Sequence, residues 1–431
     1  MLNTARPLCL VLLGLAFALP TGALGNAFTA LDARSLALGG AGVAGTRPYN
    51  APFFNPARLA GNPQVDGRRD DYAFFRPYVG ARLIDRDGFL NALDQYQENN
   101  NDARLDQSLE DLEAAIRDLD VSSEDFRAVT RAGNDLLDDY RGLSDKPLRL
   151  VGSGGINFGY PSDRWGFGAH MRQNVVAGME VRISENDLAA IQEVLDLIDM
   201  LIDLSEGAEL PDAIELPRPT EGFETEFGLR GAMVRETAIS LAAKLPGLEG
   251  TVVGLTLKSL DVETLDWVTD VNDAERGNFD IDDHSTTHTD FNVDFGITHD
   301  LDEHWTAGLM VRNAIRRNYE TVLGNEVGLR PVARAGLAFQ TRQWTVAWDV
   351  DLNEARAIGF DPAKRFFTIG TEYRPWRGLA LRGGFRHEQV LNENEYSFGF
   401  GVGIRHAHFD IGVSTDGKDS MAAALQFGFR F

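Results

Sequence analysis

The densest group of potential metal ligands lies in one short stretch, at Asp280, Asp282, Asp283, His284, His288 and Asp290. His284 and His288 are four residues apart, which would place both imidazoles on one face of a helix. Threonines between them and an expected strand at Phe291 argue against a helix. A calcium loop needs a fixed ligand order with a well-placed glycine, and this stretch has none. We therefore expect a solvated external loop, with no bound metal and no cofactor.

Signals for enzymatic chemistry are weak. Ser397, Asp349 and His387 are polar positions on expected strands, but the sequence alone does not bring them together. No Gly-x-Ser-x-Gly motif occurs. The glycine-rich residues 399–403 lack the Lys-Ser/Thr pair and the following helix of a phosphate loop. We expect that the protein is not an enzyme. The less favoured alternative is a barrel lipase or protease with scattered catalytic groups.

The elements that would carry these side chains are strands, and the last one is the most informative. Apolar residues occupy every second position of residues 421–431, with small or polar residues between them. An open strand edge with such a face invites aggregation, whereas a strand that closes a barrel in lipid has no open edge. The terminal aromatic resembles the assembly signal of bacterial outer-membrane proteins. We expect Phe427, Phe429 and Phe431 to be read by the barrel-assembly machinery.

The same alternation recurs along the C-terminal half and predicts an all-β fold, a transmembrane antiparallel barrel of about fourteen strands. Several strands carry charges on one face, which would be the lumen, since a dry core would not accept them unpaired. Four tryptophans beside short connections fit an interfacial belt. The even strand count places both ends in the periplasm and the long loops outside. Short connections are expected near residues 161–164, 246–250, 300–304, 342–343, 374–377 and 406–407, and long ones near 84–148, 184–222, 271–288, 321–329, 353–364, 389–395 and 415–420.

The N-terminus and the charge bound the location and the partners. A basic residue, a short apolar run and small residues predict a signal peptide over residues 1–25. The only cysteine, Cys9, lies inside it, so the mature chain would have no disulfide. The net charge of −24 argues against nucleic acid as a partner. The sequence thus predicts export to the outer membrane of a Gram-negative cell, where lipid surrounds the barrel.

Two insertions read as helical, at about residues 85–147 and 184–222. The first has an apolar stripe with helical spacing at Leu105, Leu109, Leu112, Ile116 and Leu119. Ser184 and Asp187 resemble a capping box before a second helix. Because such stripes must be buried, we expect the two inserts to pack on each other above the barrel. The alternative is a docking surface for a partner protein.

Residues 26–70 do not read as a membrane strand, and 71–431 would form the barrel. Gly39, Gly40 and Gly42 permit positive φ and close backbone approach. Prolines punctuate the segment after them, which includes Asn55-Pro56-Ala57. Irregular backbone at membrane depth is tolerated inside protein or beside water. We expect a compact plug threaded into the lumen.

The Gly-Gly-x-Gly run followed by Asn-Pro-Ala resembles the plug of FadL and PorV-like outer-membrane barrels. More narrowly, the chain resembles the family of conjugal transfer protein TraF. That similarity continues through residues 253–256, 292–296, 308–313 and 330–336. Leu257 and Arg316 stand where relatives are expected to have proline, and Trp267 where they have tyrosine. The family shares its name with an unrelated thioredoxin-like protein.

The resemblance implies a channel for passive uptake of hydrophobic or small solutes, closed by a movable plug. The gating candidates are Gly39, Gly40, Gly42, Asn55, Pro56 and Ala57, although these residues could instead only pack the plug against the wall. A hydrophobic small molecule would be the ligand. The alternative function is a membrane-anchored interaction protein in conjugation or secretion, which binds a partner through its external helices.

Overall fold

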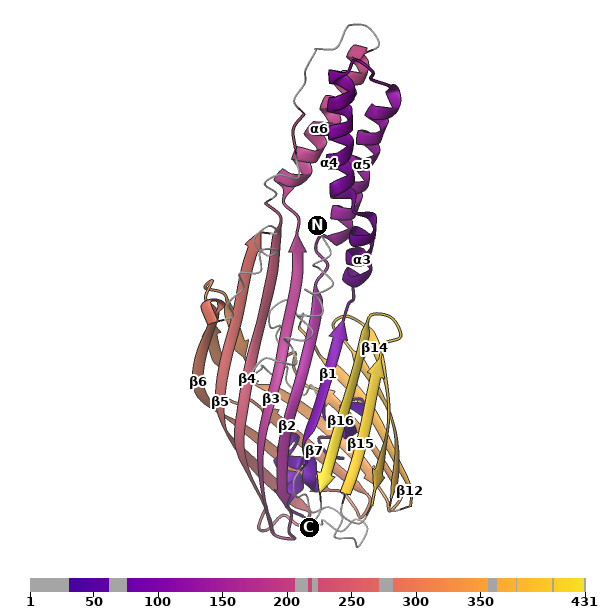
Figure 1. Cartoon of the computed structure of the whole chain (residues 1–431). Helices are drawn as coiled ribbons and strands as arrows, with labels where there is room; N and C mark the ends of the chain where they lie inside the picture. Colours follow the sequence, from indigo (N-terminus) through magenta and orange to yellow (C-terminus); the bar gives the residue numbers. More distant parts are fainter. Residues whose placement is uncertain are drawn as a thin grey trace.

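The protein is a closed antiparallel β-barrel with a helical insert standing on one end (Figure 1). The computed structural model describes residues 31–61, 76–205, 216–218, 224–270, 282–355, 363–376, 378–404 and 407–429. Fourteen strands close the barrel in sequence order, and β1 pairs with both β2 and β16. The expected transmembrane barrel is confirmed. Its strands are β1 (Tyr78–Ile84), β2 (Leu148–Tyr160), β3 (Trp165–Arg182), β4 (Glu226–Lys244), β5 (Thr251–Asp270), β6 (Ser285–Asp300), β7 (Trp305–Arg312), β10 (Val332–Gln340), β11 (Trp344–Asp351), β12 (Phe366–Trp376), β13 (Leu379–Glu388), β14 (Glu393–Gly403), β15 (Ala407–Thr415) and β16 (Ser420–Phe429).

Alternation along each strand separates a lipid face from a lumen face. On β16, Met421, Phe427 and Phe429 are exposed on the outside, whereas Ala424 and Gln426 are buried inside. Lipid takes the place of water around the outer face, so exposed apolar side chains there cost no stability. No helix among the described residues is long and apolar enough to cross a membrane.

The wall is taller on one side than on the other. β3, β4 and β5 contain 18, 19 and 20 residues, whereas β7 and β11 contain 8 each. β6 pairs with β7 only over its last residues, from Phe295 to Asp300. On the low side, two connections expected to be long, at residues 389–392 and 416–419, are short turns. The tall side therefore supports the parts of the chain outside the barrel.

The connection between β7 and β10 contains a small hairpin, β8 (Arg317–Glu320) and β9 (Glu326–Leu329), where only a loop was expected. Its strands have four residues each, too few for alternation to reveal them. Tyr319, Val327 and Leu329 pack against Leu260 and Val262 on the inner face of β5. The hairpin therefore covers part of the lumen above the plug.

The helical insert consists of α3 (Phe89–Asn99), α4 (Asn101–Arg117), α5 (Ser123–Leu143) and α6 (Glu185–Ser205). Leu105, Leu109, Leu112 and Ile116 of α4 share one core with apolar residues of α5 and α6, so the expected packing of the two inserts is confirmed. Leu119 does not belong to this stripe. It follows the end of α4, has φ of 56° and is 79% exposed.

The expected capping box at the start of α6 is wrong. Ser184 Oγ accepts from the Asn186 N–H at 3.1 Å, but the Asp187 carboxylate points elsewhere. It accepts from the N–H groups of Glu224 and Thr225, at 2.8 and 2.7 Å. Asp187 therefore ties the helix to the chain that enters β4, a contact distant in sequence.

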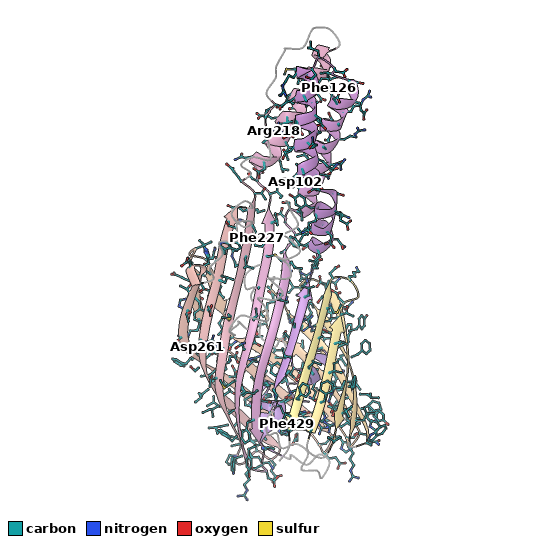
Figure 2. The ribbon with its side chains drawn as sticks, in the orientation of Figure 1. Asp102, Phe126, Arg218, Phe227, Asp261 and Phe429 are labelled. Atoms are coloured by element: carbon teal, nitrogen blue, oxygen red, sulfur yellow. The ribbon has the colours of Figure 1, made fainter. Side chains whose placement is uncertain are left out.

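The insert rests on the tall wall through an apolar junction. Phe89 and Ala92 of α3 pack with Leu148, Phe227 and Leu229. Figure 2 shows Phe227 where the strands meet the helices, Phe126 toward the far end of the bundle and Phe429 at the opposite end of the barrel. The bundle is thus anchored to the wall at one end.

Candidate functional site

The plug comprises α2 (Ala33–Ala37) and two short 3₁₀ turns, η1 (Pro48–Phe53) and η2 (Pro56–Leu59). Asp32 caps α2 by accepting from the Ser35 N–H at 3.2 Å. Proline begins both 3₁₀ turns, where its missing N–H costs no hydrogen bond. The indigo segment lies inside the barrel, toward the end opposite the helices (Figure 1).

The plug contacts all fourteen strands of the barrel. α2 packs against β1 and β13 to β16, while η1 and η2 together reach β2 to β6. Val43 approaches Gly308 of β7 and Gly336 of β10. Gly42 and Arg34 bond to β11 and β12 through Asp349 and Glu372. The described plug therefore spans the full cross-section of the lumen.

Glycines in the wall allow this close fit. A methyl group added at Gly254 would lie 2.3 Å from the backbone nitrogen of Ala57, and one at Gly296 would lie 1.9 Å from Asn55 Oδ1. Added at Gly166, it would lie 2.1 Å from the carbonyl oxygen of Leu59. These distances exclude any side chain unless the plug shifts. The inner-face glycines therefore form the seat of the plug.

Polar groups of β10 and β11 hold the glycine bend of the plug, the segment that contains Gly39, Gly40 and Gly42. Asp349 Oδ2 accepts from the N–H groups of Gly42 and Val43, at 2.7 and 3.0 Å. Arg334 donates to the carbonyl oxygen of Gly40 at 3.2 Å and also pairs with a neighbouring aspartate. Gly39 and Gly40 have φ of 66° and 86°, which favours glycine at both positions.

Asn55 joins the two halves of the plug to the wall. Its Nδ2 lies 3.0 Å from the carbonyl oxygen of Val43, and 3.3 and 3.4 Å from those of Ile297 and Leu309. Its Oδ1 accepts from the Ala57 N–H at 3.1 Å, which closes the Asn-Pro-Ala turn. One amide therefore links the glycine bend, this turn and strands β6 and β7.

A buried ion cluster also ties the plug to the wall. Glu372 of β12 pairs with Arg34 and Arg47 of the plug, at 2.9 and 3.6 Å. It also pairs with Arg382 of the wall at 2.8 Å, which in turn pairs with Asp410 at 2.6 Å. Moving the plug away would leave the Glu372 carboxylate buried without two of its cationic partners, which is energetically costly. The ion cluster therefore stabilises the plug in its observed position.

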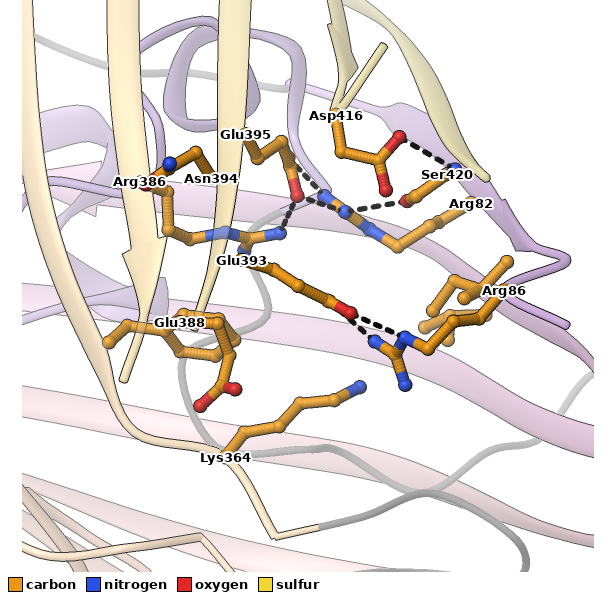
Figure 3. A pocket seen from close by; sticks show the side chains of 13 residues that line it. Arg82, Arg86, Lys364, Arg386, Glu388, Glu393, Asn394, Glu395, Asp416 and Ser420 are labelled. Atoms are coloured by element: carbon orange, nitrogen blue, oxygen red, sulfur yellow. Dashed lines mark hydrogen bonds and ion pairs between the residues drawn. The ribbon is translucent and has the colours of Figure 1, made fainter. Parts of the chain in front are cut away.

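Two cavities lie on opposite sides of the plug. On the helix side, a small cavity of about 60 Å³ is lined by ten polar or charged residues and three apolar ones (Figure 3). On the other side, a cavity of about 800 Å³ is bounded by Arg58 and Gly61 at the end of the described plug and by the β6–β7 and β10–β11 turns. The plug therefore lies between two cavities.

A family model described as F plasmid transfer operon, TraF, protein matches residues 52–351, which is more than half of the chain. The chain belongs to this family. The resemblance expected from the sequence is therefore confirmed. Among curated proteins, none matches the sequence.

Solved structures of a hydrocarbon channel and of a toluene transporter are similar to this TraF-family protein. One is a deltaS2S3 mutant of the monoaromatic hydrocarbon channel TodX, 11% identical, with a TM-score of 0.51 over 93% of this chain and 99% of that chain. Another is the Ralstonia pickettii toluene transporter TbuX, 12% identical, with a TM-score of 0.51 over 94% and 99%. At these identities the likeness concerns the fold.

The residues singled out for other chemistry do not assemble a site in the TraF-family protein. His387 lies on β13 between the inward-facing Arg386 and Glu388, so it faces the opposite side of the wall from Asp349 and Ser397. No group of three or more possible ligands in the described ranges could hold a metal ion. His288 instead bonds the Glu320 carbonyl, and Asp290 pairs with Arg317. Asp280 and Phe431 lie outside the described residues.

Sequence reasoning missed the charged residues of the lumen as a connected network. Arg82 and Arg386 meet at Glu395, Arg172 pairs with Glu236, and Lys258 lies 2.8 Å from Asp294. The available signal was the charge on alternate positions of several strands. That signal identifies a lumen face, but the pairings depend on which strands become neighbours.

Proposed function

We propose that the protein is a passive outer-membrane channel for hydrophobic or small solutes, gated by the plug, and not an enzyme. The observation that carries this proposal is the plug itself, which lies between two cavities and contacts every strand. The names of the two similar structures, a monoaromatic hydrocarbon channel and a toluene transporter, support a small solute. Passage then requires the plug to move.

The proposal includes how the chain reaches and spans the membrane. Residues 1–25 would direct export, and Phe427, Phe429 and Phe431 would be read by the barrel-assembly machinery. Short turns at the plug end would face the periplasm, and the helical insert would stand outside the Gram-negative cell. Exposed tryptophans at the short turns, such as Trp165 and Trp376, support this orientation.

The movable part would be the glycine bend at Gly39, Gly40 and Gly42 together with the Asn55-Pro56-Ala57 turn. Asp349 holds the glycine bend by accepting hydrogen bonds, and Arg334 and Asn55 hold the two pieces by donating them. A single such bond contributes about 1 kcal/mol net, and a solute or water can replace it. The wall glycines let the plug pack closely against the strands, but a glycine has no side chain with which to form a hydrogen bond or an ion pair to it. This combination favours a plug that is ordered yet displaceable.

Conductance in planar bilayers tests the gating role. The double variant Asn55→Ala, Pro56→Ala removes the Asn55 side-chain amide and with it the hydrogen bonds to Val43, β6 and β7. We therefore expect the plug to be held less firmly and the conductance to rise. Asn134→Ala is the matched control, because Asn134 makes its hydrogen bond in α5, far from the plug. Unchanged conductance in a folded double variant would contradict the gating role.

A second candidate function is an interaction protein that binds a partner through the external helices during conjugation or secretion. The observation that favours it is the buried apolar core shared by α4, α5 and α6. This core makes the insert a folded helical bundle that could present a defined surface to a partner. Removing the insert distinguishes the two functions, because a channel does not need it and a docking protein does.

A further inference from the structure

The helix-side cavity has a polar lining unsuited to hydrocarbon. Its apolar side chains are Ile84, Val151 and Phe366, and the other ten lining residues are polar or charged. A hydrocarbon placed there would remove water from charged groups without offering them hydrogen bonds. The cavity therefore favours a solute that carries polar or charged atoms of its own.

The carboxylates of this cavity already have donors from the protein. Glu395 accepts from Arg82 and Arg386, and Glu393 forms a two-point pair with Arg86, with both distances 2.6 Å. Glu388 accepts from three backbone N–H groups, those of residues 365, 390 and 391. Asp416 likewise accepts from the N–H groups of residues 418 to 420. Each of the four carboxylates therefore already accepts hydrogen bonds from the protein.

Donors, in contrast, remain open. Arg386 is only 8% exposed and donates to Glu395 through Nη2, while its Nε and Nη1 have no hydrogen-bond acceptor among the described residues. Its guanidinium also lies over the Phe366 ring, 4.5 Å from the centroid. Arg86 uses Nε and Nη2 on Glu393, which leaves Nη1 without a described partner. Figure 3 shows the Arg386 guanidinium against Glu395 and the Arg86 guanidinium against Glu393, with Lys364 reaching toward the Arg86–Glu393 pair.

We propose that this cavity binds a small hydrophilic oxyanion, a carboxylate or a phosphate, through Arg386 and Arg86, with Lys364 adding positive charge. Guanidinium N–H groups match the oxygens of such anions in direction and charge. The proposal rests on the proposed channel function and deepens it, because it makes the first solute site above the plug an anion site. A site of this kind favours small charged solutes over hydrocarbons, and so selects the small-solute half of the proposed function.

Equilibrium binding to the full-length protein in a non-ionic detergent tests the site. The probes are succinate, inorganic phosphate, uncharged succinamide and toluene. We expect succinate or phosphate to bind at least about tenfold more tightly than succinamide, a difference of about 1.4 kcal/mol. Binding of succinate alone identifies an organic carboxylate site, and binding of phosphate alone identifies a phosphate site. Binding of neither anion, or tighter binding of toluene, would overturn the proposal.

Variants assign the binding to this cavity. Arg386→Gln should weaken anion binding about tenfold or more, and Arg386→Lys should retain part of it. Arg86→Gln is the second variant, since Arg86 is partly exposed and its loss is better tolerated by the fold. Arg104→Gln on α4 removes the same charge from an exposed surface and should change nothing. Unchanged binding in both folded cavity variants would overturn the site.

Liposome uptake separates this site from the channel function. If succinate enters through the plug variant but neither succinate nor phosphate binds in an Arg386-dependent way, the anion site is wrong while the channel stands. If no solute enters through any variant but succinate still binds in an Arg386-dependent way, the site stands and the channel function fails.

Discussion

Single glycines on the wall decide where the plug can lie. Gly254 and Gly296 face Ala57 and Asn55 at distances that no side chain could occupy. Neither glycine has a positive φ, so their role is the space they leave rather than an unusual backbone conformation. The same strands alternate these glycines with outward apolar residues such as Phe295 and Ile297. The small inward-facing residues thus make room for the plug, and the apolar outward-facing residues of the same strands face lipid.

Adding one methyl group at either position should unseat the plug. In Gly254→Ala the new methyl meets backbone atoms of Pro56 and Ala57, which cannot rotate away, so we expect the turn to shift and the conductance to rise. Overpacking of this kind typically costs about 1–3 kcal/mol. Planar-bilayer recording measures the conductance, and heat-dependent gel mobility reports whether the barrel is folded.

Gly383→Ala is the matched control for this experiment. Gly383 lies on β13, and a methyl group there meets no described atom within 4 Å. Its conductance should equal that of the wild type. An equal conductance of Gly254→Ala and Gly383→Ala, with both barrels folded, would mean that the plug tolerates the methyl group and that the glycine seat does not hold it.

At the scale of elements, the N-terminus of α5 is capped by an interaction between Ser122 and Asp125. The Asp125 carboxylate accepts from both the N–H and the hydroxyl of Ser122, at 2.7 Å each. The hydrogen bond from the Ser122 hydroxyl, followed by that from its N–H, lowers the pKa of Asp125. The folded bundle therefore favours the ionised form of this carboxyl group relative to the unfolded chain.

Asp125→Asn should destabilise the helical insert in a pH-dependent way. A carboxyl group with a lowered folded-state pKa contributes stability above its unfolded pKa of about 3.9, and that contribution is lost as the pH falls through the folded pKa. At pH 7 we expect a cost of about 1 kcal/mol, typical of a lost cap. Thermal melting followed by circular dichroism at 222 nm measures the effect, and the two proteins should converge in strong acid.

Asp94→Asn provides the control for the change in charge. Asp94 is exposed on α3 and lies away from a helix start, so its replacement removes the same charge without removing a cap. The melting temperature should stay at the wild-type value. If both variants lowered it equally, general electrostatics rather than the cap would explain the change.

At the scale of the whole molecule, charge is distributed unevenly. Residues 85–147 contain 17 acidic and 7 basic residues, a net charge of −10 out of −24 for the chain. The lumen, in contrast, contains closely paired ions at Glu372, Asp410 and Glu395. The acidic surface keeps the projecting bundle soluble, while pairing inside the barrel keeps the buried wall near neutrality.

The barrel should close without its inserts, because β1 and β2 pair directly up to the Ile84–Arg149 level and β3 and β4 pair up to Arg182–Glu226. Replacing residues 85–147 and 184–222 together by short turns should leave a folded barrel with wild-type solute uptake into liposomes. Size-exclusion chromatography and heat-dependent gel mobility report the fold. Lost uptake in a folded barrel would mean that the insert takes part in passage.

Removing residues 85–147 alone serves as the contrast. This deletion exposes Ile191, Leu195 and Ile198 of α6, which are buried against α4 and α5 in the intact protein. We expect aggregation of the single-deletion variant but not of the double one. Capture of a partner protein by the intact chain, abolished in the folded double variant, would instead support the docking function.

The sequence by itself predicted the barrel, the strand number, the six short turns and the family, but two connections predicted to be long are short turns. These follow from local patterns, because alternation with a period of two and turn residues act within a few neighbouring positions. It also predicted the helical inserts, but it placed Leu119 in the stripe and assigned Asp187 to a capping box. Both errors concern helix ends, where a contact with Thr225 or a turn after Arg117 decides the outcome.

Only the tertiary structure decided how the lumen is filled. Asp349 meets Gly42, and Glu372 meets Arg34, across more than 300 residues of sequence. The hairpin of β8 and β9, the seat of wall glycines and the open donors of Arg386 likewise depend on which strands become neighbours when the barrel closes. A local pattern fixes which face a side chain occupies, whereas closure of the whole sheet fixes its partner.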